Sequence, residues 1–324
     1  MKLFPRPGTR TRCLLGLLAG LAVVGAGLNP AAAQDDATPR LDSVRTADGH
    51  AIQYTYYPAI GSQNPAGLQN APVVVLLHGD DQGRVLWDNG SVLRGTNITF
   101  PVMLQNNGYA VFTVDLRKHG ESRLGGEQVN IRPQDWEAMA AIDLVAIKQK
   151  IFEEHQAQQL NMNKLAIVAV GPTAPVAAAF AVNDWQLPPY DDAPVVQNKT
   201  PRGQDVRALV MVSPDSGAGR LSTARTITFL RGPQLGVAML VLVGAQDPQD
   251  KGQATKVYDL MAAGQRRNDP QRVYMLTPNL KDRGLGLFGK LTDQVEEPTL
   301  NFLNRHVKEY DSPWRDRRNK VTGR

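Results

Sequence analysis

Apolar runs alternate with helical patterns along this chain, and this alternation constrains the fold more than any other feature. Runs such as Asn70–Gly79 and Leu165–Ala169 lack the apolar-polar alternation of a half-buried strand, as is typical of strands buried on both faces. Further strands are expected in Gly108–Ser122, Val206–Pro214, Gly236–Pro248 and Gln271–Pro278. Because strands and helices alternate, we predict an α/β protein with a mostly parallel sheet, right-handed crossovers and flanking helices.

Other elements precede this sheet or connect its strands. Leu41–Ala59 reads as two antiparallel strands joined at an Asp48-Gly49 turn. The longest predicted helix is Arg132–Gln158, whose apolar face includes one acidic exception, Asp143. Further helices are expected from near Pro101, directly after Val170, from about Lys251 to Ala263, and from about Leu291 to Tyr310. An excursion of the chain, Asp215–Leu235, separates two of the strands.

The first 33 residues have the pattern of a secretory signal. Basic residues lie between Lys2 and Arg12, an apolar stretch follows at Cys13–Leu28, and Ala31–Ala33 forms an A-x-A site. We predict cleavage before Gln34 and export to the periplasm or the medium, with no stable membrane span afterwards. An uncleaved anchor helix is the alternative, although the apolar stretch is shorter than the roughly 20 residues that a span needs.

Removal of this leader changes the charge and the redox chemistry of the chain. The net charge falls from +5 to +1, because residues 1–33 carry four basic and no acidic side chains, so nucleic acid is not an expected partner. Cys13 is the only cysteine, and its loss excludes disulfides, thiolate metal sites and cysteine nucleophiles. We expect one domain over residues 34–311 and a disordered basic tail over residues 312–324, with binding of a partner through this tail as a minor hypothesis.

Four segments carry recognisable motifs in a consistent order. They are "VVVLLHGDDQGRVLW", "GYAVFTVDLRKHGES", "KLAIVAVGPTAP" and "MLVLVGAQDP". Together they resemble the α/β-hydrolase superfamily, and most closely its esterase, lysophospholipase and serine-aminopeptidase-like branch. The second segment is similar to that branch's Gly-Tyr-x-Val…Asp-x-Arg-Gly-His-Gly-x-Ser signature. The resemblance covers nearly all of the predicted mature chain and implies an α/β-hydrolase fold.

The third segment occupies the position of the nucleophile elbow but departs from its pattern. The family's Gly-x-Ser-x-Gly places a serine on a strained turn between a strand and a helix. This chain has Ala169-Val170-Gly171-Pro172-Thr173, so the nucleophile position, Gly171, has no side chain. The next residue's N–H is an oxyanion donor in the family, and Pro172 has none. Loss of such a donor typically removes about 3 kcal/mol of transition-state stabilisation.

The resemblance also assigns positions to the catalytic acid and base. Asp247 matches the acidic triad member. The family's histidine would follow the last strand, where this chain has Arg283-Gly284. An arginine stays protonated and cannot remove a proton from a serine. The vestigial positions are therefore Gly171, Asp247 and Arg283.

Other candidate residues follow from the same resemblance. His78, Gly79 and Asp80 form the oxyanion loop, where the histidine is expected to support structure. Ser213, which ends a strand beside Asp215, is the best candidate for a displaced nucleophile. Candidates for the cleft rim are Trp87, Trp185 and Tyr190. Asp115 and Arg117 are expected to pair at a strand exit.

The residues thus favour an exported pseudohydrolase over a working enzyme. We expect it to bind a small molecule or an envelope protein in the vestigial cleft, and fold alone does not identify that ligand. The alternative is an active hydrolase of ester or amide bonds that uses Ser213. No pattern in the sequence predicts a cofactor, a metal site or a phosphate-binding loop.

Overall fold

The computed structural model describes residues 37–80, 82–123 and 130–323. The predicted leader, residues 1–33, lies outside the described residues, so its cleavage and the export of the chain stay predictions. In the part that is described, no helix is long and apolar enough to cross a membrane.

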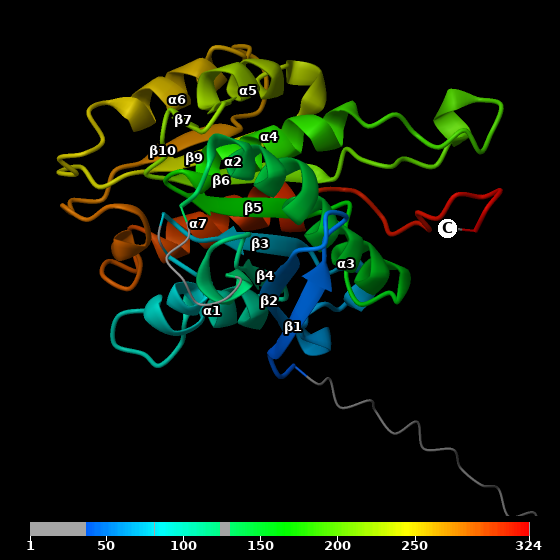
Figure 1. The fold of residues 1–324 in the computed structure, drawn as a ribbon, viewed down its shortest axis with the longest axis horizontal. Coiled ribbons are helices and arrows are strands. Elements are labelled where there is room, and N and C mark those ends of the chain that lie inside the picture. Colours follow the sequence, from blue (N-terminus) through cyan, green and yellow to red (C-terminus); the bar gives the residue numbers. More distant parts are fainter. Residues whose placement is uncertain (1–36, 81, 124–129, 324) are drawn as a thin grey trace, which may run out of the picture. The chain divides into compact units, whose positions relative to one another are not determined.

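Eight strands of the described residues form one sheet in the order β1-β2-β4-β3-β5-β6-β9-β10 (Figure 1). They are β1 (Arg40–Arg45), β2 (Ala51–Tyr57), β3 (Val73–Leu77), β4 (Ala110–Val114), β5 (Leu165–Val170), β6 (Val206–Val212), β9 (Ala238–Leu242) and β10 (Val273–Leu276). The β1–β2 and β2–β4 pairs are antiparallel and the other pairs are parallel. The predicted fold class, a mostly parallel sheet preceded by an antiparallel hairpin, is confirmed.

The apolar runs form the centre of the sheet because both of its faces are covered. Every residue of β3, β4, β5 and β9 is buried. Within β3, Val73, Val75 and Leu77 join one hydrophobic cluster, whereas Val74 and Leu76 join the other. Side chains of a strand alternate between the faces, so an unbroken apolar run supplies both layers at once.

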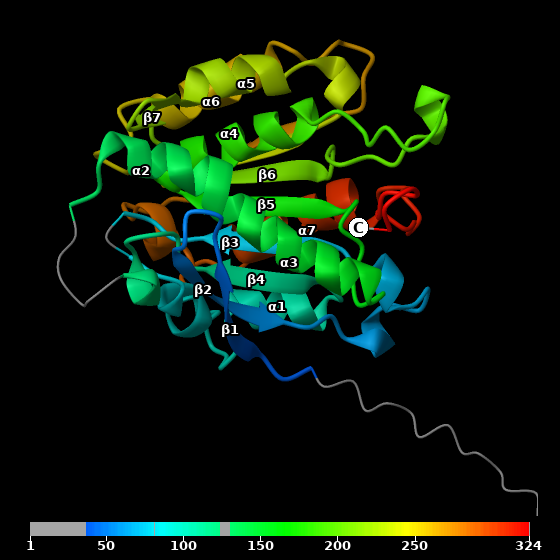
Figure 2. The ribbon, with the colours of Figure 1, turned by 45° about the vertical axis from the view of Figure 1, so that its right-hand side comes forward.

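Helices cover both faces of this sheet (Figure 2). The first cluster packs under α2 (Pro133–Ala138), α3 (Leu144–Gln156), α4 (Thr173–Gln186), α5 (Thr223–Leu230) and α6 (Gln253–Ala262). The second cluster packs under α1 (Phe100–Asn106) and α7 (Glu296–Leu303). Helix α5 and the short hairpin of β7 (Gly217–Ala218) and β8 (Leu221–Ser222) build the excursion between β6 and β9, where the sequence indicated no element.

The predicted long helix contains a π-helical turn, Met139–Asp143, between α2 and α3. Asp143, the acidic exception, is fully buried there and bonds Arg117, whose Nε lies 2.9 Å from Asp143 Oδ1. Arg117 also lies 2.7 Å from Asp48 Oδ2. The predicted Asp115–Arg117 pair is therefore wrong, because Asp115 instead accepts bonds from the backbone N–H groups of Arg84 and Glu121.

The basic C-terminal tail, for which the sequence predicts disorder, packs against the domain over residues 312–323. Arg317 is only 2% exposed, and its Nη1 lies 2.5 Å from Asp205 Oδ1. Trp314 Nε1 donates to the His155 carbonyl oxygen at 2.8 Å. Charge density suggested a solvated segment, but a buried carboxylate provides a partner for Arg317.

Candidate functional site

The candidate site lies at the carboxyl ends of the parallel strands, where function collects in open α/β sheets. Gly171 follows β5, Asp215 follows β6, Asp247 follows β9 and Arg283 follows β10. Because β5, β6, β9 and β10 are neighbours in the sheet, four loops that are distant in sequence meet at one edge.

Gly171 lies at a sharp turn between β5 and α4, at the position where the resemblance places a serine. Gly171 has a φ of +56°, and its N–H donates to the Val212 carbonyl oxygen at 2.9 Å. Pro172 follows with φ −71°, and α4 begins at Thr173. A Cβ at Gly171 would meet only Asp215 Oδ2, at 3.9 Å. The site therefore has space for a side chain that the sequence does not supply.

Thr173 holds this turn against the oxyanion loop. Its Oγ1 accepts a bond from the Val170 N–H at 3.0 Å and donates to the His78 carbonyl oxygen at 2.9 Å. Thr173 is fully buried, so its hydroxyl is a structural link and does not reach the cleft.

Arg283 lies between two carboxylates where a hydrolase would have its histidine. Its Nη1 lies 3.0 Å from Asp247 Oδ2 and its Nη2 lies 2.5 Å from Asp215 Oδ1. The side chain of Asp247 is 1% exposed, while those of Arg283 and Asp215 are 28% and 36% exposed. The three predicted vestigial positions thus meet in one cluster: Asp247 contacts Arg283 directly, and Gly171 adjoins it through Asp215.

Asp215 is a member of this cluster that the sequence reasoning did not assign to the site. Burial raises the pKa of its carboxyl, Arg283 opposes the rise, and the charge of Asp80 adds to it. The signal that could have identified Asp215 is its place three residues after a buried parallel strand, in a loop at the functional edge.

The oxyanion loop contains a histidine that is held neutral. His78 is fully buried, its Nδ1 donates to the Gly79 carbonyl oxygen at 2.7 Å, and its Nε2 accepts from the Leu116 N–H at 3.2 Å. Burial lowers the pKa of His78 to about 3. The Gly79 N–H already donates to Gln82 Oε1 at 3.1 Å. His78 therefore supports the loop, and Asp80 lies at its end.

Ser213, the candidate for a displaced nucleophile, does not face the cleft. It is 0% exposed, and its Oγ accepts a bond from the Gly284 N–H at 2.9 Å. A nucleophile needs a base within hydrogen-bond reach and a path for the substrate. The residue beside Gly284 is the protonated Arg283, which supplies no base.

The three predicted rim aromatics do not lie on the rim. Trp87 is fully buried, and its Nε1 donates to the Leu77 carbonyl oxygen at 3.1 Å. Trp185 lies at the far end of α4, where its Nε1 donates to the carbonyl oxygen of Val206, the first residue of β6, at 2.9 Å. Tyr190 follows Trp185 and donates its N–H to Thr200 at 2.8 Å. Trp185 and Tyr190 therefore belong to the amino edge of the sheet, because α4 runs back from the elbow over its full length.

The arrangement can hold a ligand by charge and hydrogen bonding. Its formal charges are three carboxylates, on Asp80, Asp215 and Asp247, and one guanidinium, on Arg283. Over the residues that the structure describes, no group of three or more His, Cys, Asp or Glu side chains could hold a metal ion.

Solved structures of hydrolases and peptidases share this architecture. A dienelactone hydrolase from Anabaena variabilis has a TM-score of 0.55 at 14% identity, over 83% of this chain and 98% of its own. An esterase from Pyrococcus furiosus has a TM-score of 0.52 at 14% identity, over 83% and 92%. An acylaminoacyl peptidase from Pyrococcus horikoshii has a TM-score of 0.56 at 11% identity, over 86% of this chain but 43% of its own.

These similarities establish the class of fold. The chain has the α/β-hydrolase fold, as its motifs predicted. At identities this low, similarity does not carry over an activity. No protein-family model matches the chain, and no curated protein sequence matches it.

Proposed function

We propose that this chain is an exported α/β-hydrolase-fold protein without serine-hydrolase activity, and that its vestigial cleft binds a small molecule or an envelope protein. The observation that carries the proposal is the position of Arg283 between Asp215 and Asp247, opposite a glycine at the elbow. A guanidinium cannot act as a general base, and its two ion pairs occupy the acid that would orient a histidine.

Two further features support the same conclusion. Pro172 has no N–H, and the Gly79 N–H is already bonded to Gln82, so two backbone positions of the oxyanion region offer no free donor. The elbow keeps its positive φ and the space for a side chain. A backbone that keeps the elbow geometry, with Gly171 and Arg283 in place of the family's serine and histidine, supports a cleft that binds a ligand without hydrolysing it.

The direct test is hydrolysis by the purified protein. We expect no turnover of short-chain nitrophenyl esters above a heat-denatured control and no covalent labelling by a fluorophosphonate. The Ser213→Ala variant serves as the matched control. Labelling of the wild type that Ser213→Ala abolishes would instead establish the active-hydrolase alternative.

A second variant shows whether the remaining backbone still supports the chemistry. The double change Gly171→Ser with Arg283→His returns the family's residues to a turn that has space for them. We expect this variant, but not the wild type, to be labelled by the fluorophosphonate at position 171. Equal labelling of the two proteins would contradict the assignment of Gly171 as the empty nucleophile position.

Export has its own test. Expression of the full chain in a Gram-negative host, followed by fractionation and N-terminal sequencing, should yield a soluble periplasmic protein that begins at Gln34. Recovery of the intact chain in the membrane fraction would favour the anchor alternative.

A further inference from the structure

A cavity of about 550 Å³ lies between α3 and α4, at the edge of the sheet opposite the elbow. Helix α4 begins beside the elbow, and the residues that it gives to the cavity, Phe180, Asn183 and Asp184, lie in its second half. At 1.5 Å per residue, a 14-residue helix spans about 21 Å. This cavity is therefore separate from the vestigial cleft, and its volume is within the usual range for small-molecule sites.

The walls between the two helices are mostly apolar. Phe180 and Met162 are 4% and 3% exposed, and Phe152 packs against the same core. At the opening, Val145 and Leu187 are 49% and 37% exposed although both are aliphatic. The side chains at the opening thus present apolar surface that a ligand could remove from water.

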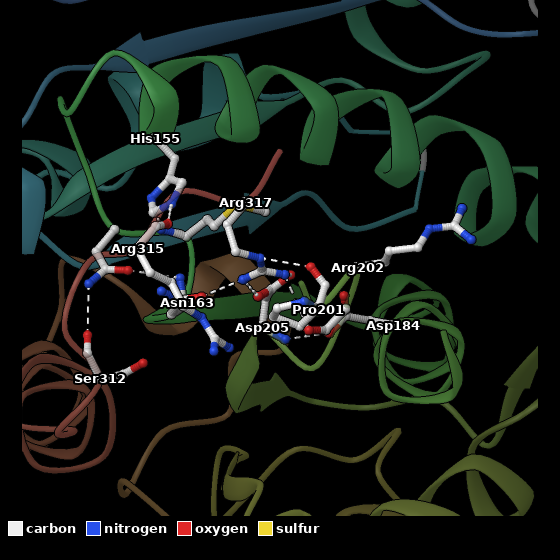
Figure 3. A network of polar contacts seen from close by, with 12 residues as sticks. His155, Asn163, Asp184, Pro201, Arg202, Asp205, Ser312, Arg315 and Arg317 are labelled. Atoms are coloured by element: carbon white, nitrogen blue, oxygen red, sulfur yellow. Dashed lines mark hydrogen bonds and ion pairs between the residues drawn. The ribbon is translucent and has the colours of Figure 1, made fainter. Parts of the chain in front are cut away.

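The charged side chains deep in the cavity satisfy one another, as Figure 3 shows around Asp205. Lys148 Nζ contacts Asp184 and lies 2.7 Å from Asp205 Oδ2. Arg317 bonds both oxygens of Asp205, Asn163 and the carbonyl oxygens of Pro201 and Gly203. The ammonium of Lys148 and the guanidinium of Arg317 have no donor left for a ligand and act as a structural base for the cavity, whereas the buried Asn163 Nδ2 has no hydrogen-bond partner within the described residues.

Arg202 differs from these cations. It is exposed and lines the cavity, its guanidinium stacks 5.2 Å from the ring centre of Tyr190, and it bonds no other side chain within the described part of the chain. In Figure 3 its side chain points away from the Asp205 network. The charges of Lys148, Arg202 and Arg317 exceed those of Asp184 and Asp205 by one, and the unpaired charge lies on Arg202.

We propose that this cavity binds an amphiphilic carboxylate, a fatty-acid-like molecule, with its carboxylate on Arg202 and its apolar chain between α3 and α4. A guanidinium presents paired N–H donors that match a carboxylate, and stacking on Tyr190 orients it before binding. The apolar walls and the exposed Val145 and Leu187 suit an aliphatic chain. This inference does not rest on the function proposed for the vestigial cleft.

Displacement of the fluorescent probe 11-(dansylamino)undecanoic acid from the purified full-length protein tests the proposal. Dodecanoate should displace the probe, and dodecanol should do so at least tenfold more weakly because it lacks the charge. Arg202→Ala should weaken dodecanoate binding about tenfold or more and remove the preference over dodecanol. Arg220→Ala is the matched control, since Arg220 is 76% exposed and does not line the cavity.

The apolar wall has its own pair of variants. Val145→Asp should abolish probe binding, whereas Val196→Asp should leave it unchanged, because Val196 is 67% exposed but does not line the cavity.

Equal displacement by dodecanoate and dodecanol would overturn the proposal, as would equal effects of Arg202→Ala and Arg220→Ala. Displacement by an apolar peptide at lower concentrations than dodecanoate would overturn it in favour of a protein ligand. Loss of binding in Arg283→Ala, with retention in Arg202→Ala, would move the ligand to the vestigial cleft.

Discussion

Arg283 and Arg317 lie at opposite edges of the sheet, and each is bound to aspartates. Arg283 joins two carboxylates from loops at the carboxyl edge, and its side chain is 28% exposed. Arg317 comes from the C-terminal tail, is 2% exposed, and bonds Asp205, Asn163 and backbone carbonyl groups. Nothing local in the sequence distinguishes the two, because each follows an aspartate directly and has another basic residue two positions before it.

The difference shows that the role of an arginine–aspartate ion pair depends on how deeply the pair is buried. Water can reach the pair of Arg283 with Asp215, so that pair can rearrange around a ligand at a small energetic penalty, whereas Asp247 on the other side of Arg283 is buried. The network of Arg317 is closed to water, so removal of one member leaves an uncompensated charge. The first arrangement suits a binding site and the second fixes a tail to the domain.

The largest expected effect comes from breaking the buried network. Arg317→Ala should lower the free energy of unfolding by about 3 kcal/mol, because Asp205 loses a buried partner. Urea unfolding followed by circular dichroism measures this change. The neighbouring Arg318→Ala, with a side chain that is 54% exposed, should change stability by about 0.5 kcal/mol or less. Equal effects of the two variants would show that the tail is not held by Arg317.

The next effect concerns acid pH and the carboxyl edge. Burial lowers the pKa of His78 to about 3, so the folded protein keeps this ring neutral while the unfolded chain takes up a proton below about pH 6.5. The stability that His78 contributes is therefore present above pH 6.5 and is lost as the pH falls toward 3. We expect a loss of about 2 kcal/mol between pH 7 and pH 5.

Urea unfolding at several pH values measures this slope. In His78→Gln, the amide oxygen can still accept from the Leu116 N–H and carries no titrating proton, so the slope should become shallower by the share of His78, about 2 kcal/mol between pH 7 and pH 5. Burial also lowers the pKa of His155 and lowers the pKa of His306 to about 4, so the rest of the slope should remain. An unchanged slope in the variant would contradict the assignment to His78.

A smaller effect is expected from filling the elbow. Gly171→Ser should destabilise the fold by about 1–2 kcal/mol, because an L-residue at φ +56° is strained although its Cβ has space. Gly203→Ala at the amino edge provides the contrast, since its Cβ would lie 1.9 Å from the Asp184 carbonyl oxygen. Thermal unfolding should rank Gly203→Ala as the more damaging change, and the reverse order would mean that the elbow has no free space.

A smaller effect than that of Arg317→Ala is also expected at Arg283. Arg283→Ala should lower the free energy of unfolding by about 1 kcal/mol, because Asp215 is 36% exposed and can be solvated, while the buried Asp247 keeps the bond that its Oδ1 accepts from the Gln249 N–H. The same urea experiment as for Arg317→Ala makes the comparison direct. A loss as large as that of Arg317→Ala would identify the carboxyl-edge cluster as a structural lock and not an adaptable site.

Much of the fold could be predicted because its signals are local. The run at β3 and the Asp48-Gly49 turn each specify a structure through burial and turn chemistry over a few residues. Helix α5 was not predicted, because it is an eight-residue element that depends on packing against α4 and α6. The acidic residue at Asp143 became explicable only when Arg117 was found beside it.

The site was predicted in part for the same reason. Motif positions located Gly171, Asp247 and Arg283 on three loops, but no local pattern showed that Asp215 would join Arg283. The prediction of Trp87, Trp185 and Tyr190 on the cleft rim was wrong, because aromatic character does not reveal whether a ring packs inward or at which edge of the sheet it lies. Trp87 lies in the core, Trp185 lies in the last turn of α4, and Tyr190 lies in the segment that follows this helix.

The sequence by itself determined that Gly171 has no hydroxyl, that Pro172 has no N–H and that position 283 carries a guanidinium and not an imidazole. These are covalent facts, and no folding can change them. Only the tertiary structure decided that Arg283 lies between Asp215 and Asp247, that the tail is fixed through Arg317, and that Arg202, at the cavity between α3 and α4, has no carboxylate partner among the described residues. Such pairings depend on distances between segments far apart in the chain, and these distances are set when the sheet and its helices pack.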